Sequence, residues 1–397
     1  MPRLLPALAL LLLTAQARPP VPSPARDPGR LALAPDAEAR WVPFELTGGG
    51  QVRFDLVLDG LPASAILDTG VSHSVLSDRW KGLDRTRVRP DGRAAAIGGA
   101  VAVGWTTTRS LRFGGLTRTG GGLVVAALPQ AATGGRAPTD LLVGRDLLAP
   151  FALDIDYPAR RFRLLPSGRL PFAGATAPLV VSPTRRVYEG EIALGGRRVR
   201  PVVVDTGDGS AVTVTAAQWR AAGLGALPAT TAIAYGLGGA QVSELAIVPD
   251  LKLGELAARE VEVRIEGPGG FSERIGVAGR IGSGFLGRYR VLLDPGARRM
   301  VLSPGPGADA PAPRSTSGLL LGVLPDRLRV LHVMRGGPAA AAGWRADELI
   351  CRVDGEAVTP AYPASALARW TVGEPGRVVR LTSCAGTERP LTLRRFY

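Results

Sequence analysis

The feature that most constrains the fold of this chain is a repeated segment in which apolar residues lead into Asp-Thr-Gly. The first copy, residues 65–77, reads AILDTGVSHSVLS, and the second copy, residues 202–214, reads VVVDTGDGSAVTV. The two aspartates, Asp68 and Asp205, lie 137 residues apart. One such triplet carries little information in a chain with 52 glycines, so the repeat is informative only if its surroundings repeat as well.

The surroundings do repeat, at nearly the same spacing. A glycine-containing hairpin turn precedes each aspartate, at Gly60 and at Gly196. Four later segments also match: 97–100 with 237–240, 111–116 with 251–256, 143–148 with 281–286, and 156–161 with 294–299. All of these spacings fall between 136 and 140 residues. Such constancy over a long stretch indicates one duplicated unit.

Composition favours short strands joined by turns over long helices. The 397-residue chain contains 52 Gly and 34 Pro, whereas aromatic residues make up only 5%. Residues 52–58 (VRFDLVL) alternate apolar and polar side chains, as a half-buried strand does. We therefore expect a mostly β fold with more than one domain.

The N-terminus has the pattern of a secretion signal, which we place at residues 1–17. Arg3 precedes an apolar stretch, residues 4–13, and Ala15-Gln16-Ala17 is a small-residue cleavage site. That stretch is shorter than the roughly 20 apolar residues that span a bilayer. We therefore expect an exported protein, periplasmic or secreted, with no integral membrane segment in the mature chain. Residues 18–40, rich in Pro, Ala and Arg, are expected to form a flexible lead-in.

The remaining chain divides into three parts. The duplicated units are expected to be residues 41–168, called the first unit, and residues 178–303, called the second unit. Residues 304–317 (PGPGADAPAPRSTS) read as a stiff, polar linker. Residues 318–397 have the size of one small domain.

Charge and metal-ligand content argue against several functional classes. The net charge is +14, but the arginines are scattered without runs, so we expect no nucleic-acid partner. The two histidines and two cysteines, His73, His332, Cys351 and Cys384, do not have the spacing of a zinc site, and we expect no metal or cofactor. The cysteines either form a disulfide in an oxidising compartment or remain free buried thiols.

The duplicated aspartates suggest a specific chemistry. A buried strand would deliver each carboxylate to a fixed point, and the glycine after Thr allows a sharp turn. If the two units pack about a two-fold axis, the carboxylates share one site. Two carboxylates about 3 Å apart hold one proton between them, so one acts as general base and the other as acid. A water between them could then attack a peptide carbonyl without a covalent intermediate.

These motifs and their duplication resemble aspartic proteases of the pepsin and retropepsin clan, and each unit is similar in size to a retropepsin-like lobe. The resemblance implies an acid protease fold of two pseudo-two-fold-related β lobes, with Asp68 and Asp205 as the catalytic pair. It also implies a glycine-tipped hairpin flap over the cleft, within residues 94–105 or 232–243. The residues implied as support for the catalytic loops are Thr69, Gly70, Ser72, Thr206, Gly207 and Ser210, and those of the flap are Gly98, Gly99, Tyr235, Gly238 and Gly239.

The second unit departs from the family pattern in three places. Gly209 stands where the first unit has Ser72, with Ser210 next to it. Asp208 adds a carboxylate, which either is an exposed turn residue or raises the pKa of the pair by pointing inward. Arg280 interrupts the apolar pair that should precede Gly282.

The C-terminal segment resembles a bacterial PDZ domain. A glycine-flanked apolar stretch is followed by a strand, then by residues 336–343 (GGPAAAAG) and 347–355 (DELICRVDG). The resemblance implies a small α+β domain that captures peptide C-termini by strand addition. The implied peptide-binding residues are Gly318, Leu319, Leu320, Leu321, Gly322 and Val323. The alternative is a small β-rich domain that only packs on the remaining chain.

Together these patterns predict an aspartic endopeptidase acting on protein or peptide substrates, with a C-terminal peptide as a further ligand of the PDZ-like domain. A non-enzymatic alternative is an inactive protease-fold scaffold, or a peptide-binding protein acting through its PDZ domain. A third arrangement is a dimer in which each unit pairs with its own counterpart, although tandem duplication makes pairing within one chain simpler.

Overall fold

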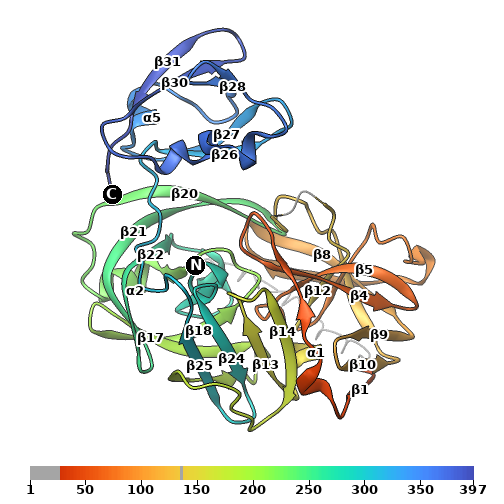
Figure 1. The fold of residues 1–397 in the computed structure, drawn as a ribbon. Coiled ribbons are helices and arrows are strands. Elements are labelled where there is room, and N and C mark those ends of the chain that lie inside the picture. Colours follow the sequence, from red (N-terminus) through yellow and green to blue (C-terminus); the bar gives the residue numbers. More distant parts are fainter. Residues whose placement is uncertain (1–26, 135–136) are drawn as a thin grey trace, which may run out of the picture.

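The computed structural model describes residues 27–134 and 137–397 (Figure 1). The predicted signal peptide, residues 1–17, lies outside the described residues, as do residues 18–26 of the lead-in. The chain is mostly β, as predicted, with its strands distributed over several sheets. Among the helices of the described residues, none is both long enough and apolar enough to cross a membrane.

The first unit is built on one large sheet. The described residues form 11 strands in the order β1-β10-β9-β4-β5-β12-β6-β11-β8-β7, with β3 paired to β4. The β4–β5 hairpin turns at Asp59 and Gly60, whose φ angles of 51° and 87° suit a two-residue turn. The strands are β1 (Arg30–Leu33), β3 (Glu45–Leu46), β4 (Val52–Leu58), β5 (Leu61–Leu67), β6 (Val75–Ser77), β7 (Arg89–Ala96), β8 (Gly99–Thr107), β9 (Ser110–Phe113), β10 (Leu116–Thr119), β11 (Gly122–Ala126) and β12 (Leu141–Val143).

The second unit repeats the central part of that sheet. Its order is β16-β17-β18-β23-β19-β22-β21-β20 in the described chain. The six strands β18-β23-β19-β22-β21-β20 have the same parallel and antiparallel neighbours as β5-β12-β6-β11-β8-β7, so the sequence repeat is also a structural repeat. The strands are β16 (Val180–Val181), β17 (Tyr188–Leu194), β18 (Arg197–Asp205), β19 (Val212–Thr215), β20 (Ala229–Gly236), β21 (Gly239–Leu253), β22 (Leu256–Glu266) and β23 (Gly279–Gly282).

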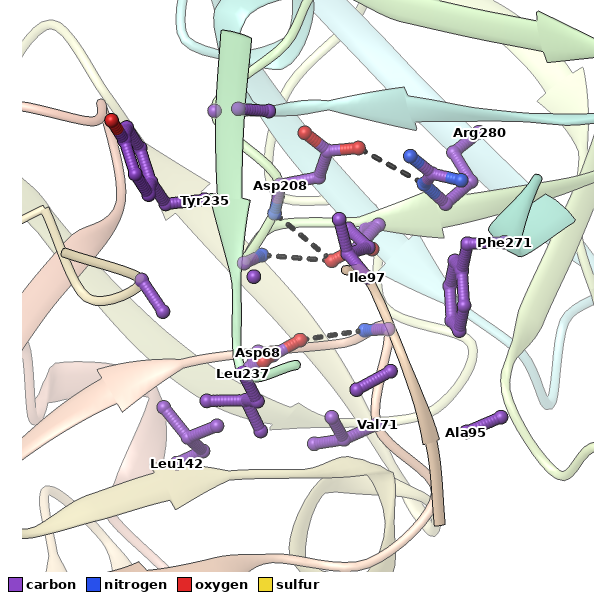
Figure 2. Close-up of a pocket in the computed structure, with 18 of the residues that line it drawn as sticks. Asp68, Val71, Ala95, Ile97, Leu142, Asp208, Tyr235, Leu237, Phe271 and Arg280 are labelled. Carbon is purple, nitrogen blue, oxygen red and sulfur yellow. Dashed lines mark hydrogen bonds and ion pairs between the residues drawn. The ribbon is translucent and has the colours of Figure 1, made fainter. Parts of the chain in front are cut away.

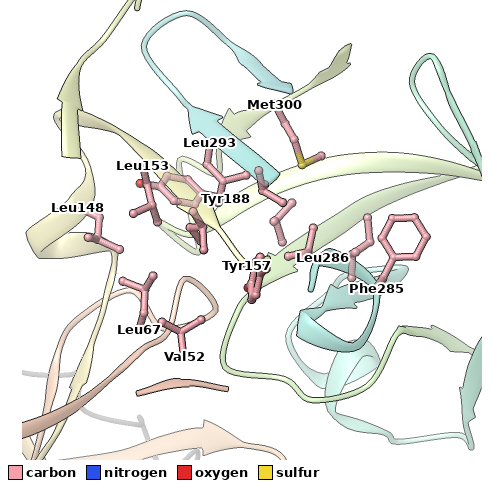
Figure 3. Close-up of a cluster of buried hydrophobic side chains, with 14 of the residues drawn as sticks. Val52, Leu67, Leu148, Leu153, Tyr157, Tyr188, Phe285, Leu286, Leu293 and Met300 are labelled. Carbon is pink, nitrogen blue, oxygen red and sulfur yellow. The ribbon is translucent and has the colours of Figure 1, made fainter. Parts of the chain in front are cut away.

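A third sheet joins the two units. Its order is β15-β25-β24-β13-β14-β2, and the central pair brings Leu153 of the first unit opposite Leu293 of the second. Figure 3 shows these leucines packed with Tyr157 and Tyr188 in the buried core. The two units therefore share one hydrophobic core. The strands are β2 (Val42–Pro43), β13 (Phe151–Asp156), β14 (Arg161–Pro166), β15 (Ala175–Pro178), β24 (Tyr289–Asp294) and β25 (Arg299–Pro304).

Residues 318–397 form a separate small sheet in the order β26-β27-β28-β30-β31, with β29 paired to β28. Cys351 and Cys384 are joined by a disulfide with a Cα–Cα distance of 4.9 Å, which decides between the two alternatives that the sequence left open. The strands are β26 (Leu319–Val323), β27 (Leu328–Val333), β28 (Leu349–Val353), β29 (Glu356–Ala357), β30 (Val378–Ser383) and β31 (Glu388–Thr392).

The helices are short and lie between strands. Two of them, α1 and α4, occupy equivalent places directly after β12 and β23. The α-helices are α1 (Arg145–Leu148), α2 (Ala216–Ala221), α3 (Phe271–Arg274), α4 (Ser283–Leu286) and α5 (Pro338–Ala341), and the 3-10 helices are η1 (Ala37–Ala39), η2 (Arg85–Arg87), η3 (Tyr362–Ala364) and η4 (Ala366–Val372).

Two segments expected to be flexible or linking are structured. Within the predicted lead-in, β1 pairs with β10, because Leu31 and Leu33 pack against the core of the first unit. Within the predicted linker 304–317, the Thr316 N–H donates to the Thr371 carbonyl oxygen at 2.9 Å, and Thr316 is 6% exposed. The prevalence of Pro and Ala around both segments concealed these short attachment points.

Candidate active site

The two Asp-Thr-Gly loops meet where the units face each other. Asp68 follows the end of β5, and Asp205 is the last residue of β18. Their carboxyl groups lie within hydrogen-bonding reach of each other and are 9% and 7% exposed. Both line a cavity of about 820 Å³ between the units. The structure therefore brings together the two residues that the sequence repeat singled out.

The two threonines hold the loops together by reciprocal hydrogen bonds. The Thr69 N–H donates to Thr206 Oγ1 at 3.1 Å, and the Thr206 N–H donates to Thr69 Oγ1 at 3.0 Å. Each hydroxyl in turn donates to a carbonyl oxygen of the other unit, that of Val204 or Leu67, at 2.7 Å. Both threonines are fully buried. These bonds fix the distance between the carboxyl groups, since either loop can move only with the other.

The two glycines are required by close approach rather than by their φ angles. A Cβ on Gly70 would come within 2.3 Å of the Asp205 carboxyl carbon, and one on Gly207 within 2.4 Å of the Asp68 carboxyl carbon. Each glycine N–H also donates to the aspartate of its own loop, at 3.1 Å for Gly70 and 3.0 Å for Gly207. Any larger residue would push one carboxyl group out of the shared site.

Burial makes the carboxyl pair hold on to a proton. Burial raises the pKa of Asp68 to about 6, although hydrogen bonds from Gly70 and Asp205 act in the opposite direction. Burial also raises the pKa of Asp205 well above its ordinary value, and the neighbouring charges of Asp68 and Asp208 raise it further. The pair consequently titrates as a unit and carries one proton over an intermediate pH range.

Two hairpins, rather than one, cover the cavity. The β7–β8 and β20–β21 hairpins meet at their tips, where the Gly238 N–H donates to the Ile97 carbonyl oxygen at 2.9 Å. A Cβ on Gly98 would lie 2.3 Å from the Gly239 carbonyl oxygen, and one on Gly238 would lie 2.3 Å from the Gly99 nitrogen. The predicted flap glycines thus form the contact between the hairpins.

The cavity side of these hairpins is visible in Figure 2, where Tyr235, Leu237 and Ile97 surround the space that contains Asp68. Tyr235, predicted as a flap residue, lies on β20 and lines the cavity. Because Ile97 and Leu237 come from opposite hairpins, each unit contributes to the cover of the site.

The two predicted loop serines line the cavity but are bonded elsewhere. Ser72 Oγ lies 3.1 Å from His73 Nδ1, and Ser210 Oγ donates to Asp208 Oδ1 at 2.7 Å. No hydrogen bond from either hydroxyl to Asp68 or Asp205 is among the contacts of the described residues. Both hydroxyls therefore bond neighbouring residues rather than the carboxyl pair.

Asp208 is not the exposed turn residue that the sequence favoured as one alternative. It is 9% exposed in its side chain, and its Oδ2 accepts from Arg280 Nε at 3.0 Å. Arg280 Nη1 also donates to Glu266 Oε1 at 3.0 Å, and Figure 2 shows Arg280 beside Asp208. Burial acts to raise the pKa of Asp208, but the Arg280 guanidinium and Ser210 hold it below its ordinary value.

The network of Asp208, Arg280 and Glu266 was missed because its members are distant in sequence. The one available signal was the arginine that interrupts an apolar pair, which the sequence showed only as a partial match. Gln51 was missed for the same reason. Its Nε2 donates to the Gly207 carbonyl oxygen at 2.8 Å and to that of Ala132 at 3.0 Å, so it ties the first unit to the second aspartate loop.

The predicted peptide-binding residues of the C-terminal domain lie on and beside β26, an edge strand of its sheet. The Gly318 N–H donates to Ser315 Oγ at 3.0 Å, and the Leu319 N–H donates to Ser317 Oγ at 3.1 Å. These two N–H groups are therefore already bonded within the domain. Leu320 packs against the second unit, whereas Val323 is 44% exposed.

Compared with known proteins, the chain matches no protein-family model and no curated protein. No group of three or more His, Cys, Asp or Glu suited to a metal ion occurs in the residues that the structure describes. A function for this chain is therefore inferred from the carboxyl pair, the loops that hold it and the cavity above it.

Proposed function

We propose that this protein is an exported aspartic endopeptidase with two retropepsin-like lobes and a C-terminal PDZ-like domain. The observation that carries the proposal is the buried pair of Asp68 and Asp205, held by reciprocal threonine bonds at the floor of a covered cavity. Raised pKa values for both carboxyl groups agree with a pair that shares one proton. A pair of this kind has the acid and the base that peptide hydrolysis needs.

The proposed reaction uses a water molecule between the two carboxyl groups. The ionised carboxylate accepts a proton from the water, whose oxygen forms a bond to the peptide carbonyl carbon. The protonated carboxyl donates to the carbonyl oxygen, which gives a neutral tetrahedral diol. The carbon–nitrogen bond then breaks as a hydroxyl proton returns to one carboxylate and the other carboxyl protonates the leaving nitrogen. The pair ends in its starting protonation state.

The C-terminal domain has a supporting role in this proposal. Its Arg335 Nη2 donates to Glu244 Oε1 at 2.7 Å, and the Thr231 hydroxyl lies 2.8 Å from His332 Nε2. Both contacts are made with the β20–β21 hairpin, so the domain contacts one of the two hairpins that cover the cavity. We propose that it holds peptide C-termini or regulates access to the cavity.

The test uses the mature chain and three variants, with a denatured protein as substrate over a range of pH. Asp68→Asn and Asp205→Asn should each lower the cleavage rate by about 10²–10⁴-fold, because each removes one half of the acid–base pair. Asp309→Asn, at an exposed aspartate, serves as the matched control and should keep the parent rate.

Cleavage that survives both substitutions would refute the assignment of the pair. A parent chain that cleaves nothing, yet binds peptides through residues 318–397, would instead support the inactive scaffold.

A further inference from the structure

The two halves of the cavity occupy equivalent positions in the repeat but differ in chemistry. In the first unit, a row of three neighbouring residues crosses β11, β6 and β12, and in the second unit the equivalent row crosses β22, β19 and β23. All six residues line the cavity. The first row is Val124, Val75 and Leu142, and the second row is Arg264, Thr213 and Arg280.

The half of the cavity formed by the first unit is apolar. Val75, Val124, Ala126 and Leu142 belong to one buried cluster, against which Leu237 of the opposite hairpin packs. Figure 2 shows Leu142 and Leu237 among the residues that line the cavity together with Asp68. An aliphatic substrate side chain would bury apolar surface here without leaving a buried polar group unpaired.

The half formed by the second unit is charged. Arg280 forms ion pairs with both Asp208 and Glu266, each at 3.0 Å. Arg264 interacts with the charges of Asp208 and Glu262, but no hydrogen bond from its guanidinium is among those of the described residues. The charged half thus offers a guanidinium without a hydrogen-bond partner to the cavity that contains the carboxyl pair.

The Arg264 guanidinium determines which substrate side chain binds favourably in this half of the cavity. An aliphatic side chain placed against Arg264 would remove water from the guanidinium and return no hydrogen bond, which is unfavourable. A carboxylate or carboxamide oxygen would accept from it, and charged or bidentate bonds to arginine are the stronger ones.

We infer that the cavity is a two-sided recognition site for peptides in which one aliphatic residue is joined to one Asp, Glu, Asn or Gln. The first unit receives the aliphatic side chain, and Arg264 of the second unit receives the side-chain oxygen. The inference rests on the proposed function for the statement that the bond between these two residues is the one cleaved. The binding preference itself does not require catalysis.

The test measures binding of uncleavable peptides to the full mature chain. The peptides are amidated at the C-terminus, to avoid carboxylate capture by the C-terminal domain, and contain a reduced bond between Leu and a varied residue, in both orders. We expect Glu or Gln at the varied position to bind roughly tenfold or more tightly than Leu, the effect of one good hydrogen bond to a charged group. Equal or tighter binding of the Leu-Leu peptide would overturn the inference.

Two variants and a control locate the preference. Arg264→Leu should abolish it, and Arg264→Gln, which keeps a polar side chain, should reduce the preference for Glu more than that for Gln. Arg259→Leu, at an exposed arginine of the same strand, should leave it unchanged. A preference that persists in both Arg264 variants would contradict the assignment. Because only binding is measured, a chain that shows the preference but cleaves nothing would refute the proposed reaction alone.

Discussion

In the first unit, Val71 follows the Asp-Thr-Gly triplet and Leu142 lies on β12, whereas the equivalent positions of the second unit hold Asp208 and Arg280. The equivalence follows from the backbone, since the Arg145 N–H donates to the Val71 carbonyl oxygen just as the Ser283 N–H donates to that of Asp208. Apolar side chains in one unit and a buried ion pair in the other thus accompany the same turn. The strand order and the threonine bonds are common to both units. The two units therefore keep the same fold although these neighbouring residues differ.

The difference shows which properties the two-fold arrangement imposes and which it leaves free. Gly70 and Gly207 cannot differ, because each faces the opposite carboxyl group at contact distance. Val71 and Leu142, with their second-unit equivalents, have no such constraint. The charge of Asp208 acts on both members of the carboxyl pair and raises the pKa of each, an effect that Val71 cannot supply. The difference between the two units therefore affects the pKa values on which the proposed reaction depends.

The largest predicted effect comes from removing the centre of the ion-pair network. Arg280→Leu, which installs the first-unit residue, leaves Asp208 and Glu266 buried without their cation and should destabilise the protein by about 3–5 kcal/mol. Urea unfolding followed by circular dichroism measures this. The triple variant Asp208→Val, Glu266→Ala and Arg280→Leu, which installs the whole first-unit set, should recover most of the loss. A triple variant no more stable than Arg280→Leu would show that the apolar residues of the first unit cannot replace the ion-pair network of the second.

The carboxyl pair should make stability depend on pH. Since the pKa of Asp68 rises from 3.8 to about 6 on folding, the folded state holds a proton that the unfolded state releases. This contribution is fully present below pH 3.8 and is lost as pH rises through about 6. We expect a loss of about 2–3 kcal/mol from this source. Because other carboxyl groups titrate too, the measurement is the difference in unfolding free energy between the parent and Asp68→Asn at several pH values. A difference independent of pH contradicts the assignment.

The threonine bonds should contribute equally in the two units. Thr69→Val and Thr206→Val each remove a buried hydroxyl that both donates and accepts, so each should cost about 1–3 kcal/mol. Thermal unfolding of the two variants side by side measures the symmetry. Thr107→Val, at an exposed threonine of β8, is the control. Clearly unequal losses of stability in the two variants would contradict the prediction that the two threonines contribute equally.

The smallest predicted effect is on the pH profile of cleavage. Asp208→Asn removes a negative charge that raises the pKa of both Asp68 and Asp205, and it takes one of two carboxylate partners from Arg280, which lowers the pKa of Asp205. Both changes act in the same direction, so the alkaline limb of the profile should move to lower pH by up to about one unit. The pH dependence of kcat/KM measures it. An unchanged profile would mean that Asp208 carries no charge in the folded protein, and a shift to higher pH would contradict the assigned direction of its effect.

Sequence patterns anticipated what depends on local motifs and on their repetition. The pairing of Asp68 with Asp205 followed from two identical triplets in repeated surroundings, and the mostly β character followed from glycine and proline content. The burial of Asp208 did not follow, because its partner Arg280 lies 72 residues away and only the folded chain brings them together. Strand β1 was missed because two leucines among Pro, Ala and Arg carry little signal without their partner β10.

The most direct test of the shared carboxyl pair compares two uncleavable peptides of one sequence. One carries a hydroxyl on a tetrahedral carbon in place of the scissile carbonyl, and the other carries a reduced bond without the hydroxyl. If Asp68 and Asp205 act together on a tetrahedral intermediate, the parent should bind the hydroxyl peptide roughly 100-fold or more tightly than the reduced one, and Asp68→Asn and Asp205→Asn should each abolish that advantage. Equal affinity of the parent for the two peptides, or an advantage that survives both substitutions, would contradict the account.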